Sequence, residues 1–309
     1  MRRSLQHCTT LGLLLFSFIF PLLLPTIWTI RAQTPTEQPA SEEVTIPGVV
    51  EKMINKQKTT DIQGTFFPAM PKSTEKRPTV LMFPQISDGD REGLVLADRM
   101  MLDPLAKALQ SRGFNVLTMD ISGYYWDGAK QPPLAESLKD ASAAYTWLTE
   151  HPAVDPKKIG VLGSSIGANL ALLMIEQYAD IVAAVVLSPA PDYGGLKPNP
   201  EGVVSRPVRL YAAKSEADNP TLGTWYKQFP EVITPAEKGH GISLLTDSQT
   251  MAGDIGDWFT AKMPSETANP VVPIYDPYTF YCCAGWRSLF TFGLAGFVII
   301  LRAPKRYRM

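Results

Sequence analysis

The sequence predicts an α/β protein with a mostly parallel, open sheet that carries helices on both faces. Two observations support this fold class. Short strand-like segments alternate along the chain with longer segments of helical spacing. Most strand-like segments are apolar at nearly every position, which is typical of parallel strands covered on both faces. With 45% apolar residues in 309, the chain can bury one substantial core. We therefore expect a single main domain.

The expected elements follow in order along the middle of the chain. The strand segments are 60–67, 79–83, 114–120, 158–163, 181–188 and 207–213. The first of them is expected to run antiparallel to its neighbour. The helical segments are 93–113, 134–151, 166–178 and 248–261.

Charge and cysteine content exclude several classes of function. The formal net charge is -1 and the isoelectric point is near 6.3, so the chain lacks the clustered positive charge with which proteins engage nucleic-acid phosphates. The three cysteines, Cys8, Cys282 and Cys283, all lie in the terminal segments. The central region therefore has no disulfide framework and no thiolate metal site, and we expect no metal or cofactor.

Both ends of the chain are apolar. Residues 1–32 place two arginines before a long apolar run, which predicts a signal peptide or an N-terminal anchor. Residues 278–309 form a candidate C-terminal membrane anchor with a basic tail. Their uninterrupted apolar run is shorter than the roughly 20 residues that span a bilayer, and a helix packed on the domain is the alternative. The basic residues at both ends predict an exported, membrane-anchored protein whose central domain lies on the non-cytoplasmic side.

Linkers separate these ends from the domain. Residues 33–47 and 263–277 are rich in Pro, Thr, Ser and Glu, a composition that buries too little apolar area to fold. The folded domain is accordingly expected over 48–262.

A pentapeptide at the end of one strand segment suggests chemistry. Residues 163–167, Gly-Ser-Ser-Ile-Gly, fit G-x-S-x-G with Ser165 at the centre, between a predicted strand and a predicted helix. Such a turn is sharp and lifts the central hydroxyl out of the sheet. It also offers the Ile166 N–H, at the start of the helix, to an oxyanion. The alternative is an ordinary glycine-rich loop.

A nucleophilic serine needs a base and an acid. His240 follows Ser165 in a glycine-flanked loop before the last helix, in the order that G-x-S-x-G enzymes use, whereas His151 precedes it and is better explained as a surface or capping residue. Two acids, Glu216 and Asp218, follow the strand at 207–213. We expect Asp218 to orient the imidazole, with Glu216 and then Asp192 as alternatives.

These residues resemble the α/β-hydrolase superfamily. The resemblance covers about residues 60–262, and its most specific parts are "GVLGSSIGANLAL", "AAKSEAD" and "GHG" in that order. The chain is most similar to the small lidless branch around dienelactone hydrolases. Ser165 stands where that branch has its cysteine nucleophile.

The resemblance implies a role for each matching position. It assigns Ser165 as nucleophile, His240 as base and Asp218 as acid, and it places oxyanion donors at Ile166 and in the loop after 79–83. Many relatives have His-Gly where this chain has Pro-Gln at 84–85. The second donor is therefore Ile86 or, failing that, Gln85.

The expected function is a serine hydrolase of carboxylesterase type that cleaves a small acyl substrate through an acyl-enzyme on Ser165. No lid domain fits between the strands at 181–188 and 207–213. Two alternatives remain open. One is a non-catalytic, membrane-tethered binding or scaffold protein on the same fold. The other is a peptidase or an acyltransferase.

Overall fold

The computed structural model describes most of the central domain. Its described residues are 41–54, 57–71, 73–85, 103–122, 133–248 and 250–264. The predicted signal or anchor at 1–32 and the predicted anchor at 278–309 lie outside them, as do both linkers for the most part. Among the helices of the described residues, none is long and apolar enough to cross a bilayer.

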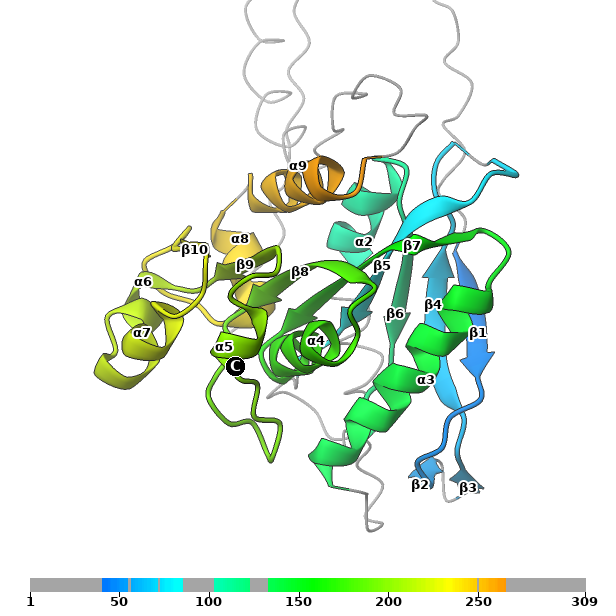
Figure 1. Ribbon diagram of the computed structural model, residues 1–309, viewed down its shortest axis with the longest axis horizontal. Coiled ribbons are helices and arrows are strands. Elements are labelled where there is room, and N and C mark those ends of the chain that lie inside the picture. The colour runs from blue at the N-terminus through cyan, green and yellow to red at the C-terminus, as the bar shows by residue number, and fades with distance from the viewer. Residues whose placement is uncertain are drawn as a thin grey trace, which may run out of the picture. The chain divides into compact units, whose positions relative to one another are not determined.

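An eight-stranded sheet forms the centre of the domain (Figure 1). Its strands lie in the order β1-β4-β6-β5-β7-β8-β9-β10. The two strands at one edge, β1 and β4, pair antiparallel, and β4 pairs antiparallel with β6. All pairings from β6 to β10 are parallel. The strands are β1 (Glu42–Ile46), β4 (Ile62–Phe67), β5 (Arg77–Phe83), β6 (Asn115–Met119), β7 (Val154–Ser164), β8 (Ile181–Leu187), β9 (Val208–Tyr211) and β10 (Val232–Ile233).

Helices cover both faces of this sheet, as the sequence predicts (Figure 1). α3 (Ser137–Glu150) and α4 (Ile166–Gln177) pack on one face, and α2 (Asp103–Gln110) and α9 (Met251–Lys262) on the other. Along β5, Val80 and Met82 join the core under α2 and α9, whereas Leu81 and Phe83 join the core under α3 and α4. A strand buried on both faces has no polar alternation, which explains its continuous apolar run.

Shorter elements complete the described domain. They are the hairpin β2 (Lys52–Ile54) and β3 (Gln57–Thr59), the 3₁₀ turns η2 (Leu134–Glu136) and η3 (Gly241–Ser243), and the helices α5 (Pro200–Val203), α6 (Lys214–Ala217), α7 (Pro220–Tyr226) and α8 (Leu244–Asp247). The buried Lys52 Nζ lies 2.6 Å from Asp140 Oδ2 and ties the hairpin to α3. Ser122 donates a second hydrogen bond to the same carboxylate oxygen.

The structure corrects one predicted boundary. β1 falls within 33–47, which the composition assigned to a linker, and it pairs with β4 from Glu42–Phe66 to Ile46–Ile62. Only alternate positions of an edge strand face the core, so β1 carries a short apolar signal: Ile46 is fully buried while Thr45 is exposed. The domain therefore begins before residue 48.

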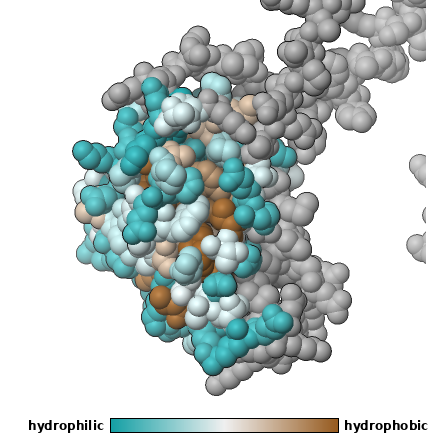
Figure 2. Space-filling view, turned by 90° about the vertical axis from the view of Figure 1, so that its right-hand side faces the viewer, coloured by the Kyte–Doolittle hydropathy of each residue, from teal (hydrophilic) through white to brown (hydrophobic). Residues whose placement is uncertain are grey.

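On the face shown in Figure 2, hydrophilic side chains predominate and hydrophobic ones gather towards the middle. Among the described residues, the large hydrophobic side chains classed as exposed are Val49, Val204 and Val232. The apolar residues of the described domain are thus mostly in its two cores.

Candidate active site

Ser165 occupies a strained turn between β7 and α4. Its φ is 54°, in the left-handed region that costs a non-glycine residue about 1–3 kcal/mol. The flanking glycines are required by close packing. A Cβ at Gly163 would lie 1.9 Å from the Gly167 carbonyl oxygen, and one at Gly167 would lie 2.4 Å from the Phe83 carbonyl oxygen. The sequence G-x-S-x-G is therefore needed for this turn, which presents Ser165 at the carboxyl end of β7.

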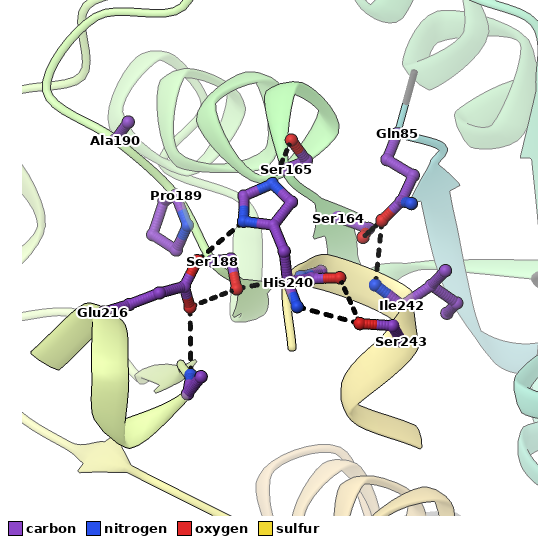
Figure 3. A network of polar contacts seen from close by, with 12 residues as sticks. Gln85, Ser164, Ser165, Ser188, Pro189, Ala190, Glu216, His240, Ile242 and Ser243 are labelled. Atoms are coloured by element: carbon purple, nitrogen blue, oxygen red, sulfur yellow. Dashed lines mark hydrogen bonds and ion pairs between the residues drawn. The ribbon is translucent and has the colours of Figure 1, made fainter. Parts of the chain in front are cut away.

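The His240 imidazole lies directly beside this hydroxyl (Figure 3). Its Nε2 is 2.7 Å from Ser165 Oγ, although 75 positions separate the two residues. His240 lies between β10 and η3. The loop therefore brings a base within proton-transfer distance of the serine.

Glu216 contacts the other ring nitrogen. Its Oε1 is 2.6 Å from His240 Nδ1, while its Oε2 accepts hydrogen bonds from Ser188 Oγ at 2.7 Å and from the Ala213 N–H at 2.9 Å. Burial raises the pKa of this carboxyl, but the hydrogen bonds from His240, Ser188 and Ala213 outweigh burial and hold the pKa below its ordinary value. An ionised Glu216 accepts a hydrogen bond from Nδ1–H, which leaves Nε2 of a neutral ring to accept the Ser165 proton.

The structure replaces Asp218 with Glu216 as the candidate acid. Glu216 is the third residue of α6, so its side chain folds back onto the N–H of Ala213, the N-cap residue of this helix. Asp218 follows two positions later, which puts it about 200° further around the helix axis, and it makes no hydrogen bond to His240. Asp192 is also excluded from this contact, because it accepts from the Gly195 N–H and pairs with Lys197.

The expected oxyanion donors are only partly within the described residues. The Ile166 N–H is the first of α4, where the helix dipole favours negative charge. Ile86 lies outside the described residues. The side chain of Gln85 has another use: its Oε1 accepts hydrogen bonds from Ser164 Oγ at 2.7 Å and from the Ile242 N–H at 2.9 Å. A role for the Gln85 backbone N–H stays a prediction.

The loop that carries His240 is held by three side-chain oxygens (Figure 3). Each satisfies one of three consecutive backbone N–H groups. They pair as His240 N with Ser243 Oγ at 2.8 Å, Gly241 N with Ser188 Oγ at 2.9 Å, and Ile242 N with Gln85 Oε1 at 2.9 Å. We call Ser243, Ser188 and Gln85 the loop clamp.

Sequence reasoning missed the loop clamp because its members come from three separate elements. Ser188 is also unusual in its backbone, since its φ is 52° at the carboxyl end of β8. No local pattern marks it as functional, and its relation to Glu216 and Gly241 exists only in the folded chain.

This arrangement suits nucleophilic chemistry. A half-buried carboxylate, an imidazole and a hydroxyl are connected in series, which is what activation of a serine requires. Within the ranges that the structure describes, no group of three or more His, Cys, Asp or Glu side chains is placed to hold a metal ion.

Sequence comparisons match part of the chain. Residues 141–193 match the family described as "BAAT / Acyl-CoA thioester hydrolase C terminal". Uncharacterized proteins from two strains of Mycobacterium tuberculosis, CDC 1551 / Oshkosh and H37Rv, are 36% identical over 101 residues, which is 31% of this chain. The match spans 35% of the length of each of these relatives.

Comparisons with solved structures cover a larger share of the chain than the sequence comparisons do. An α/β serine hydrolase without a lid from Xanthomonas campestris aligns with a TM-score of 0.53 and 14% identity, over 75% of this chain and 98% of the other. An esterase from Pyrococcus furiosus aligns with a TM-score of 0.53 and 17% identity, over 72% of this chain and 93% of the other. Esterase 2 of Thermogutta terrifontis, phosphoramylated by tabun, aligns with a TM-score of 0.53 and 16% identity, over 75% of this chain and 98% of the other. At such identities the likeness establishes the fold, and it confirms the architecture expected from the sequence.

Proposed function

Because this chain has the α/β-hydrolase fold, we propose that it is a serine hydrolase of carboxylesterase type. One observation carries the proposal: His240 lies 2.7 Å from Ser165 Oγ through one ring nitrogen and 2.6 Å from Glu216 through the other. A fold alone would not support a reaction, but this set of contacts does. It also argues against a non-catalytic scaffold, which has no need for the strained backbone at Ser165.

The mechanism is acyl transfer to water in two steps. Ser165 Oγ attacks the acyl carbon as His240 Nε2 takes its proton, and Glu216 stabilises the imidazolium that forms. The same proton then passes to the leaving oxygen as the acyl–oxygen bond breaks. Water, deprotonated by His240, releases the acid from Ser165 in the second step. The Ile166 N–H stabilises the oxyanion that forms in each of the two steps.

A small acyl substrate suits the described architecture. Between β8 and β9 the chain forms only a short loop and the four-residue helix α5, so this segment contributes no lid domain. A site that receives no lid from this segment is expected to bury less of a ligand than a site capped there.

A second candidate is hydrolysis of an acyl-CoA thioester. The family match names this activity, and it spans 141–193, which includes Ser165, α4 and β8. The same acyl-enzyme forms from either substrate, because only the leaving group differs. Peptidase and acyltransferase activity remain alternatives on the same residues.

Fluorophosphonate labelling tests the proposal. We expect covalent labelling of the wild-type protein and of the control Ser142→Ala, whose hydroxyl lies on α3, and no labelling of Ser165→Ala. Absence of labelling in the folded wild-type protein would instead favour the scaffold. Turnover of p-nitrophenyl butyrate, butyryl-CoA and a butyryl amide, compared at equal concentration, then separates esterase, thioesterase and amidase activity.

We also propose that the domain is exported and anchored to a membrane through its apolar ends, on the sequence argument alone. Expression of the full chain followed by fractionation tests this. Recovery of the protein from the membrane fraction, with the domain accessible to protease on the non-cytoplasmic side, is the expected result.

A further inference from the structure

Tyr193 lies next to the reacting atoms and has no part in the mechanism above. Its Oη is 3.3 Å from His240 Nε2, the same nitrogen that lies 2.7 Å from Ser165 Oγ. Because Nδ1 is engaged by Glu216, Nε2 of the neutral ring has one lone pair, and two hydroxyl groups compete for it.

Ser165 has the better contact of the two. The serine contact of 2.7 Å has the usual length of a hydroxyl hydrogen bond, whereas the tyrosine contact of 3.3 Å is long and therefore weak. Among the described residues, this long contact is the one hydrogen-bond partner that Tyr193 Oη has. The phenol therefore has a hydroxyl hydrogen available to a substrate atom that approaches Nε2.

The backbone around Tyr193 is held to the nucleophile helix. Asn169, four residues after Ser165 on α4 and fully buried, donates from Nδ2 to the carbonyls of Ala190 at 2.7 Å and Leu196 at 2.9 Å. Its Oδ1 accepts from the Ala190 N–H at 2.9 Å. One buried amide thus fixes both ends of the short segment that contains Tyr193, relative to the turn of Ser165.

A tight turn completes the support. Tyr193 and Leu196 exchange backbone hydrogen bonds in both directions across Gly194 and Gly195, whose φ values are 57° and 96°. Only residues that tolerate positive φ form such a turn without strain. The Tyr193 ring itself packs on the core under α3 and α4. A phenol held this firmly is preorganised, so a hydrogen bond from it costs little ordering entropy.

The position of Tyr193 Oη relative to His240 Nε2 identifies the substrate atom that Tyr193 would contact. The leaving oxygen must come within about 2.6–3.2 Å of Nε2 to receive its proton. It therefore lies on the side of the imidazole that Tyr193 Oη also faces. We propose that Tyr193 is a catalytic residue that donates a hydrogen bond to the leaving-group oxygen during acylation, and that it thereby favours esters of weakly acidic alcohols.

The step balances without a further reactant. The bond from Ser165 Oγ to the acyl carbon forms, the bond from that carbon to the leaving oxygen breaks, and the serine proton reaches the leaving oxygen through Nε2. Tyr193 keeps its own proton throughout and only stabilises the charge that develops on the leaving oxygen. The inference rests on the proposed serine-hydrolase function.

Two esters with the same acyl group test the proposal. In ethyl butyrate the leaving alkoxide needs stabilisation, whereas p-nitrophenolate in p-nitrophenyl butyrate leaves with little help. For Tyr193→Phe we expect kcat/KM on ethyl butyrate to fall about tenfold to a hundredfold, as for a lost hydrogen bond to a charged group, and on p-nitrophenyl butyrate by less than about threefold. The control Tyr178→Phe, a tyrosine at the far end of α4 that packs on the same core, should leave both unchanged.

The outcomes separate this inference from the proposed function. Equal losses on both esters would indicate a merely structural role for Tyr193 and overturn the proposal, as would an unchanged rate on ethyl butyrate. Fluorophosphonate labelling of Tyr193→Phe at the wild-type rate, with an unchanged melting temperature, is expected and shows that Ser165 is still activated in a folded protein. If the wild-type protein is neither labelled nor active on either ester, the serine-hydrolase function itself fails, and this inference fails with it.

Discussion

The two histidines in the described part of the chain show how surroundings decide the use of one residue type. His151 ends α3 and packs at a tilt against Phe66 and Trp147, with ring centroids 4.5 and 4.8 Å away. Its Nδ1 accepts a long hydrogen bond from the Ala153 N–H. His240 has a carboxylate on one nitrogen and a serine hydroxyl on the other. The first contributes packing area, and the second can move a proton.

Removing the His240 ring should abolish most activity, whereas removing the His151 ring should mainly reduce stability. The loss of activity is the largest effect that we expect. His240→Ala should lower kcat on p-nitrophenyl butyrate by at least about 10⁴-fold, because the serine loses its base. His151→Ala should leave kcat within about twofold while lowering the free energy of unfolding by about 1–2 kcal/mol, through lost aromatic contacts. Steady-state kinetics and urea denaturation of both variants measure this. A large loss of kcat in the His151 variant would contradict the comparison.

The two acids after β9 allow the next comparison. Glu216→Gln should lower kcat by about 10³–10⁴-fold, because an amide can donate to Nδ1 and stabilise the wrong tautomer. Asp218→Asn, two positions away, should change kcat by less than about twofold. Kinetics on the same ester distinguish them, and the reverse ranking would restore Asp218 as the acid.

Removing part of the loop clamp should have an intermediate effect. Gln85→Leu leaves the Ile242 N–H and the Ser164 hydroxyl without their acceptor and should cost about 1–3 kcal/mol in the free energy of unfolding. Because His240 would then be less well positioned, we expect kcat to fall more than KM changes. Gln85→Glu keeps an acceptor in place and should recover part of the loss in kcat. Equal stability of the Leu variant and the wild-type protein would show that the clamp is unimportant.

The smallest expected effect concerns the pH dependence of stability. Burial lowers the pKa of His151, although the nearby Glu42 opposes this shift. The unfolded chain therefore takes up a proton at this position first as pH falls, so the folded state loses stability below the ordinary histidine pKa of about 6.5. In His151→Phe the decline of melting temperature between pH 7 and pH 5 should be shallower. An unchanged slope would assign the decline to other groups.

Glu216 adds to the same profile at lower pH. Its pKa is lowered in the folded state, so its contribution is complete above the ordinary pKa of a glutamate and is lost as pH falls through the folded value. Glu216→Gln should therefore flatten the acid limb of the stability profile below pH 5, where the His151 variant should still follow the wild type.

Most of the fold was predictable because the buried parallel strands and the amphipathic helices carry strong local signals. β5 and β8 read as continuous apolar runs, and the turn at Ser165 needs glycines that the sequence displays. The antiparallel direction of β4 was also predicted correctly. β1 was missed because an edge strand carries only a short alternating signal within a polar segment.

The candidate site was less accessible to sequence reasoning. Ser165 and His240 stand out by motif and by elimination, but the choice between Glu216 and Asp218 depends on how α6 starts after β9. Glu216 and Asp218 are only two positions apart, and the start of the helix decides which carboxylate reaches the imidazole. No local sequence pattern predicts where the helix starts. Tyr193 and Ser188 approach the site through long-range contacts, so the folded structure was needed to find them.

Mapping the site of a covalent adduct tests the central claim most directly. The protein is treated with a fluorophosphonate, digested, and sequenced by mass spectrometry, beside His240→Ala and Glu216→Gln. We predict one modified residue, Ser165, in the wild-type protein, with labelling at least about 10³-fold slower in both variants. An adduct on Ser164 or another side chain, or labelling of Ser165 at the same rate without His240, would contradict the account.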